Sequence, residues 1–225
     1  MDLRNETFAE PARSTSRHAS RAGRGLELAD CELDRGGGPD GNERMTAAAA
    51  AALMILLAAE GVTIVFLRPL LSAHVFIGML LVPPVVLKLA TTGYRFFRYY
   101  AGATSYRRKG PPKPLLRLLA PLVVLSTIGV FATGVALAVA GPPGGAVLAL
   151  HKASFVVWLP TTGVHVLAYV WRVPRLTAAD WRRRKTLRGS RLRRAVLIVT
   201  IVLGVGLAVA TVGLATPWLS QWSPP

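Results

Sequence analysis

The chain has 225 residues, of which 52% are hydrophobic, and it carries a formal net charge of +16. These properties are compatible because apolar and basic residues are segregated: lysines and arginines cluster between long, almost uncharged runs. The basic clusters adjoin hydrophobic segments of bilayer length, which favours a membrane surface over nucleic acid as the charged partner. The single cysteine, Cys31, excludes an intrachain disulfide and a thiolate-built metal site within the chain.

The first 44 residues are rich in arginine, serine, glycine and acidic residues, with few aromatic or β-branched side chains. Such a segment buries too little apolar surface to fold, so we predict that residues 1–44 form a disordered extension. Met45 directly precedes the first hydrophobic run and is a candidate translation start.

Five hydrophobic runs follow, each close to the roughly 20 residues that a helix needs to cross the hydrocarbon core. We therefore predict an all-α integral membrane protein with five transmembrane helices in residues 45–217 and a short outer tail in residues 218–225. The predicted spans cover residues 46–67, 71–92, 118–140, 146–170 and 195–217.

The charges of the loops predict the orientation. Basic residues are dense between the second and third spans and again, from Arg172 to Arg194, between the fourth and fifth. The other two connections contain a single cation, Arg68. Because positive loops stay in the cytoplasm, we expect a cytoplasmic N-terminus and an outer C-terminus in the cytoplasmic membrane, anchored by Trp218 and Trp222. An alternative role for the basic loops is to bind lipid headgroups or a cytoplasmic partner.

Ionisable side chains inside a bilayer are costly and are candidates for function. His151 and His165 are 14 residues apart, which is nearly four helical turns and about 21 Å, so both face one side of the fourth span. The same spacing separates His74 from Lys88 on the second span. Because both spans run inward, His74 and His151 are predicted at one depth, with Lys88 and His165 at a deeper one.

Two imidazoles at one depth on neighbouring helices are what a b-type haem needs as axial ligands. Gly78, one turn below His74, would let the flat macrocycle approach. The outer cations Arg68 and Lys152 are each close in sequence to a proposed ligand, where they would face the propionates. We therefore expect one haem b, held by His74 and His151 near the outer face.

The remaining ionisable residues have several interpretations. Glu60 would orient a ligand imidazole, carry protons or form a hydrogen bond between helices. Lys88 would be a poor iron ligand because a protonated amine has no lone pair. His165 is then a core residue, a weak ligand or the remnant of a second site.

Residues 72–78 around His74, and residues 150–154 and 164–166 around His151 and His165, resemble the ligand regions of bacterial membrane cytochromes b. That family includes the small haem-b subunits that accompany hydrogenases, formate dehydrogenases and molybdopterin oxidoreductases. Residues 87–95 are similar to an uncharacterised actinobacterial branch. The resemblance covers residues 46 to about 216, but Lys88 stands where family members with two haems have a histidine.

The resemblance implies a cytochrome-b-like bundle of the first four helices, with the fifth packed peripherally or against a partner. It also implies an electron-transfer subunit of a respiratory chain, rather than a stand-alone enzyme, that exchanges electrons with quinol or a partner redox subunit. Two alternatives stay open. One is a haem-free membrane scaffold, and the other is a small transporter or proton pathway through Glu60, Lys88 and His165.

Overall fold

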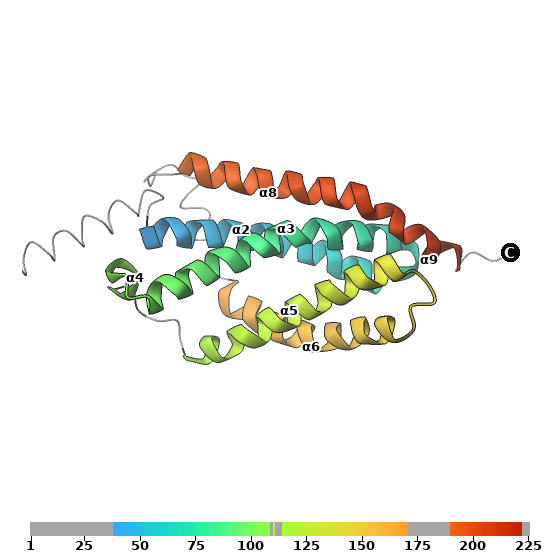
Figure 1. The fold of residues 1–225 in the computed structure, drawn as a ribbon, viewed down its shortest axis with the longest axis horizontal. Helices are drawn as coiled ribbons and strands as arrows, with labels where there is room; N and C mark the ends of the chain where they lie inside the picture. Colours follow the sequence, from blue (N-terminus) through green and yellow to red (C-terminus); the bar gives the residue numbers. More distant parts are fainter. Residues whose placement is uncertain (1–37, 109, 111–113, 171–189, 222–225) are drawn as a thin grey trace, which may run out of the picture.

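The computed structural model describes residues 38–108, 110, 114–170 and 190–221. Within these ranges every regular element is helical (Figure 1). The elements are α2 (Gly38–Val65), α3 (Leu67–Tyr100), α4 (Thr104–Arg108), α5 (Pro114–Ala140), α6 (Gly145–Tyr169), α8 (Ser190–Thr211), the 3-10 helix η1 (Val212–Ala215) and α9 (Thr216–Ser220).

Five of these helical segments are long and apolar enough to cross a membrane. In the apolar parts of α5 and α6, hardly any residue is buried inside the fold, with Ser126 of α5 as an exception. Large apolar side chains such as Leu125, Leu167 and Val202 are exposed instead. A water-soluble protein rarely exposes so much contiguous apolar surface, whereas a bilayer covers it at no cost. The chain is therefore an all-α, multi-pass membrane protein, as predicted.

Helix α3 lies in the middle of the bundle, between α2 and α8, while α5 and α6 form an antiparallel hairpin beside it (Figure 1). The fifth span was predicted to be peripheral, but α8 packs on α3 about as extensively as α2 does. A Cβ atom added to Gly204 of α8 would lie 2.6 Å from the carbonyl oxygen of Leu80. The glycine therefore permits a backbone approach that a larger residue would block.

Helix α2 begins at Gly38, seven residues before Met45, so the prediction of disorder is wrong for residues 38–44. The Asn42 side-chain amide donates a hydrogen bond to the carbonyl oxygen of Thr91 on α3 (3.1 Å). Four residues further along α2, the carbonyl oxygen of Thr46 accepts a hydrogen bond from Lys88 Nζ (3.2 Å). Polar side chains thus join this end of α2 to α3. Residues 1–37 lie outside the described residues.

The predicted spans match the observed helices in place, and the differences lie at the ends. A single residue, Phe66, separates α2 from α3, and Leu70 interrupts the helical dihedral angles at the start of α3. At its other end, α3 continues past residue 92 to Tyr100. Hydropathy locates the part of a helix inside the hydrocarbon but not its polar extension, which explains the longer helix.

The two ends of the bundle differ in charge. Among the described residues, α4, the end of α3 and the starts of α5 and α8 carry the arginines of the basic loops, and they lie together at one end (Figure 1). The opposite end has Arg68 and Lys152. There Trp218 of α9 packs over the connection between α5 and α6, so close to Gly144 that a Cβ at that glycine would lie 2.6 Å from the indole. Trp222 and most of the second basic loop lie outside the described residues.

Candidate functional site

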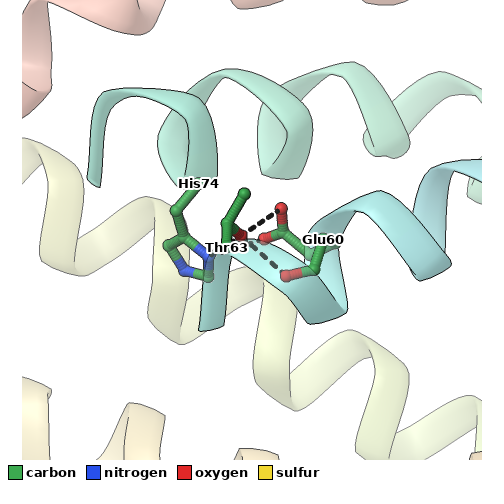
Figure 2. Close-up of polar contacts among 3 residues, drawn as sticks. All are labelled: Glu60, Thr63 and His74. Carbon is green, nitrogen blue, oxygen red and sulfur yellow. Dashed lines mark hydrogen bonds and ion pairs between the residues drawn. The ribbon is translucent and has the colours of Figure 1, made fainter. Parts of the chain in front are cut away.

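Three side chains converge where α2 and α3 lie side by side (Figure 2). His74 Nδ1 lies 2.9 Å from Glu60 Oε1 and 3.2 Å from Thr63 Oγ1. The Thr63 hydroxyl also lies 2.6 Å from the backbone oxygen of Glu60 and 3.2 Å from Glu60 Oε2. The carboxylate can accept a hydrogen bond from Nδ1–H, while the threonine hydroxyl donates to Glu60. This arrangement fixes the ring and leaves Nε2 as the nitrogen that carries a lone pair.

The pair of His74 and Glu60 is largely shielded from solvent, since the two side chains are 24% and 12% exposed. A hydrogen bond to a carboxylate is strong in such surroundings, because the local dielectric is low. The predicted role of Glu60 in orienting an imidazole therefore has a direct geometric basis. Thr63, which sequence reasoning missed, completes the contact.

His151 of α6 is held in a similar way by α5. Its Nδ1 atom lies 3.1 Å from Thr133 Oγ1. The Thr133 hydroxyl lies 2.7 Å from the carbonyl oxygen of Gly129, to which it can donate, so that its oxygen can accept from Nδ1–H. The Ser154 hydroxyl lies 3.1 Å from Thr133 Oγ1 and donates to the carbonyl oxygen of His151 (2.9 Å). Here too, the Nδ1 contact leaves Nε2 as the potential ligand atom.

A glycine makes room for the His151 ring. A Cβ atom added to Gly134 would lie 3.1 Å from Cε1 and 3.5 Å from Nδ1 of His151. The imidazole therefore packs directly against the backbone of α5. By comparison, a Cβ atom added to Gly78 would point towards α2 and lie 3.6 Å from Glu60 Oε1. This is an ordinary van der Waals distance, so Gly78 faces the Glu60 carboxylate, whereas the sequence predicted that it faces a macrocycle.

The structure places the two candidate ligands within range of electrostatic interaction, without close packing between their helices. His151 is close enough to His74 and to Glu60 for their charges to interact, although the residues come from different helices. In the described part of the chain, neither His74 Nε2 nor His151 Nε2 has a hydrogen-bond partner. Helix α6 packs chiefly against α5 and not against α3. The two rings thus belong to helices that do not pack closely together, whereas the sequence predicted ligands on neighbouring helices.

The cations expected near this site are both exposed. Arg68 is at the start of α3 and Lys152 immediately follows His151. Within the described ranges, neither side chain has an ion pair or hydrogen bond. Both are therefore free to contact carboxylate groups of a ligand at this end of the bundle.

Lys88 and His165 are the pair that the sequence predicted at a deeper level. Lys88 donates to Thr46 and is close enough to His165 for its charge to act on that imidazole. His165 packs against Tyr169, with ring centroids 5.1 Å apart. Its buried Nδ1 atom has no hydrogen-bond partner among the described residues. Because nothing orients this ring through Nδ1, His165 lacks the support that His74 and His151 both have.

The donor set constrains the kind of ligand. In the part of the chain that the structure describes, no group of three or more His, Cys, Asp or Glu residues could hold a metal ion. Two imidazoles as the donor set suit a metal whose other ligands come from a macrocycle. The site residues therefore fit a haem better than a bare transition-metal ion.

The α5 partners of His151 were not predicted, although the sequence contains a signal for them. Ser126 and Thr133 are seven residues apart on an otherwise apolar helix, as are Ser154 and Thr161 on α6. This spacing places each pair on one helix face. The two faces meet in the structure, where Ser126 Oγ lies 3.2 Å from Thr161 Oγ1 and Trp158 Nε1 donates to Thr127 Oγ1 at 3.1 Å.

No protein-family model, curated protein or solved structure matches the chain.

Proposed function

We propose that the chain is a membrane b-type cytochrome in which His74 and His151 hold one haem b between α3 and α6. The observation that carries this proposal is the matched orientation of the two imidazoles. Each engages a partner through Nδ1, Glu60 for His74 and Thr133 for His151, and each leaves Nε2 without a partner in the described chain. This pattern is typical of metal-ligating histidines, whose second nitrogen donates to a fixed acceptor.

Other residues support the same ligand. Arg68 and Lys152 are exposed cations at the end of the bundle near the two histidines and would contact the haem propionates. The lipid-facing surfaces of the helices would keep water away from the ligand. A haem held there would supply reversible one-electron transfer, while His74 and His151 would hold it and Arg68 and Lys152 would provide the cations.

The proposal includes one haem rather than two. The deeper pair offers a lysine that donates to Thr46 and a histidine whose Nδ1 has no partner among the described residues. We propose that the chain is an electron-transfer subunit, rather than a stand-alone enzyme, which exchanges electrons with quinol or a partner redox subunit. The basic end would face the cytoplasm and the histidine pair would lie near the outer face of the cytoplasmic membrane.

The direct test is the haem content of protein purified after expression with an excess of haem precursor. We expect one haem b per chain in a pyridine haemochrome assay and a reduced-minus-oxidised spectrum typical of a b-type cytochrome. The double variant His74→Ala/His151→Ala should lose this haem, while His165→Ala serves as the matched control and should retain it. A chain that folds without haem under these conditions would instead favour the alternative of a haem-free membrane scaffold.

The proton-pathway alternative predicts a different result. Glu60 contacts His74, and Lys88 lies 14 residues after His74 on α3. The two groups are therefore about 21 Å apart along the helix axis. Proton flux through haem-free protein in liposomes, abolished by Glu60→Gln, would support that pathway. We expect no such flux, because Glu60 is engaged by His74 and Thr63.

A further inference from the structure

An arginine at the junction of α3 and α5 is held in place by an aromatic side chain. Arg117, at the start of α5, donates a hydrogen bond to the Tyr100 hydroxyl at the end of α3. Its guanidinium carbon lies 5.9 Å from the centre of the Tyr100 ring. Tyr100 in turn packs on Phe96, with ring centroids 4.5 Å apart. These contacts orient the guanidinium, which on most protein surfaces moves freely.

The Arg117 guanidinium has no carboxylate partner among the described residues. Its side chain is exposed, and its remaining N–H groups can donate to an external acceptor. A planar guanidinium held in one orientation suits the bidentate recognition of a phosphate. The junction therefore offers an oriented donor group for an anion.

A stripe of apolar side chains on α5 begins at Leu118, the residue after Arg117, and continues into the membrane span. Leu118, Leu122 and Leu125 are 77%, 46% and 67% exposed. Their spacing of four and three residues places them on one face of α5. The described chain leaves a large part of each leucine exposed, so in a bilayer they contact acyl chains.

We propose that Arg117 and Tyr100, together with this leucine stripe, form a binding site for an anionic phospholipid. The phosphate would contact Arg117 and one acyl chain would lie along Leu118, Leu122 and Leu125. A phospholipid matches both parts of the site, whereas a soluble phosphate would leave the leucines uncovered. The exposed rings of Phe96 and Tyr100 suit the headgroup region, where aromatic side chains are enriched. This proposal does not depend on haem binding.

An anionic lipid is favoured over a zwitterionic one by the charge around the site. The end of α3 and the helix α4, which lie at the same end of the bundle (Figure 1), carry Arg95 and Arg107, and these raise the local positive potential. Each basic side chain near a surface strengthens the attraction of acidic lipid by a modest amount. A lipid with a net negative charge therefore gains more from this end of the bundle than phosphatidylcholine does.

The test is native mass spectrometry of the full chain titrated with phosphatidylglycerol or phosphatidylcholine. We expect preferential retention of phosphatidylglycerol by the wild type and an approximately 5-fold loss of that affinity in Arg117→Gln. Arg191→Gln is the matched control, because Arg191 is an exposed arginine at the same end of the bundle, at the start of α8. It should bind like the wild type. Tyr100→Phe, which keeps the ring but removes the hydroxyl, should weaken binding in the same direction as Arg117→Gln.

Two outcomes would overturn the proposal. If Arg117→Gln and Tyr100→Phe both bind phosphatidylglycerol like the wild type, the junction is not the site. If Arg191→Gln loses as much affinity as Arg117→Gln, the lipid responds only to net charge. Inorganic phosphate should not displace the bound lipid, and full displacement would identify a site for free phosphate instead.

Discussion

The imidazole of His74 and the carboxylate of Glu60 come from different helices, yet Nδ1 and Oε1 are 2.9 Å apart. The contact joins α2 to α3 at one polar level, and the hydrogen bond from Lys88 to Thr46 joins the same helices at the other. The two contacts are separated by 14 residues on each helix. The packing register of α2 against α3 therefore places the candidate ligand His74 next to Glu60, the residue that orients it.

Replacement of Glu60 tests whether this contact supports a ligand. We expect Glu60→Gln to weaken haem binding by about 10- to 100-fold, because the amide is a poorer acceptor for Nδ1–H than the carboxylate. The measurement is haem retention during titration with apomyoglobin, a strong haem acceptor. Thr127→Val, on α5, is a control that leaves the contacts of both ligands intact. Equal retention by the wild type and Glu60→Gln would show that the carboxylate has no orienting role.

Thr133 should have a comparable role for His151. Thr133→Val preserves the shape of the side chain but removes the oxygen that lies 3.1 Å from Nδ1. We expect a lower haem affinity and a shifted midpoint potential, since the basicity of the ligand depends on its Nδ1 partner. Thr133→Ser, which restores the hydroxyl, should recover both values in a spectroscopic redox titration. An unchanged potential in Thr133→Val would contradict the assignment.

The close approach of α8 to α3 depends on Gly204. Gly204→Ala would place Cβ 2.6 Å from the Leu80 carbonyl oxygen, so the helices would have to move apart. We expect a loss of about 1–3 kcal/mol in the free energy of unfolding. Gly206→Ala is the matched control, because no atom lies within 4 Å of a Cβ at that position. Unfolding in a denaturing detergent, followed by circular dichroism, should separate the two variants. Equal stabilities would refute the packing argument.

Replacement of Lys88 tests whether this residue has a structural role or belongs to the haem site. Burial of its amine costs desolvation energy, and Lys88→Met keeps the length of the side chain without that cost. We expect the thermal midpoint to stay the same or rise, with the haem content unchanged. Loss of the haem in a folded Lys88→Met protein would show that the deeper level belongs to the haem site.

The segment before Met45 should contribute to stability. Removal of the Asn42 amide eliminates its 3.1 Å hydrogen bond to the Thr91 carbonyl. We expect Asn42→Ala to cost about 1 kcal/mol in the free energy of unfolding. A chain that starts at Met45 should be less stable than one that starts at Gly38, as measured by thermal unfolding. Identical midpoints would show that residues 38–44 do not support the fold.

The five helices could be predicted because a span needs a long apolar run, and each run here is separated from the next by polar residues, prolines or glycines. The 14-residue spacing predicts that His151 and His165 share one face of their helix, and that His74 and Lys88 share one face of theirs. Helical periodicity determines which residues of one helix share a face and a depth. The relative positions of residues on one helix depend only on local sequence, so they can be predicted from it.

The partners of these residues could not be predicted with the same certainty. The contact of His151 with Thr133 depends on how α5 packs against α6, and that of His74 with Thr63 depends on how α2 packs against α3. A single sequence does not specify which helix faces meet. The close approach of Gly204 to Leu80 has the same origin, because an apolar helix with several glycines offers more than one packing face.

The central claim is that His74 and His151 together ligate one haem. Low-temperature electron paramagnetic resonance of the oxidised protein tests it most directly, because the signal distinguishes a low-spin bis-histidine haem from a high-spin haem with one axial histidine. We predict a low-spin signal in the wild type and in His165→Ala, and its loss in His74→Ala and in His151→Ala. A low-spin signal that survives in the double variant His74→Ala/His151→Ala would contradict the assignment.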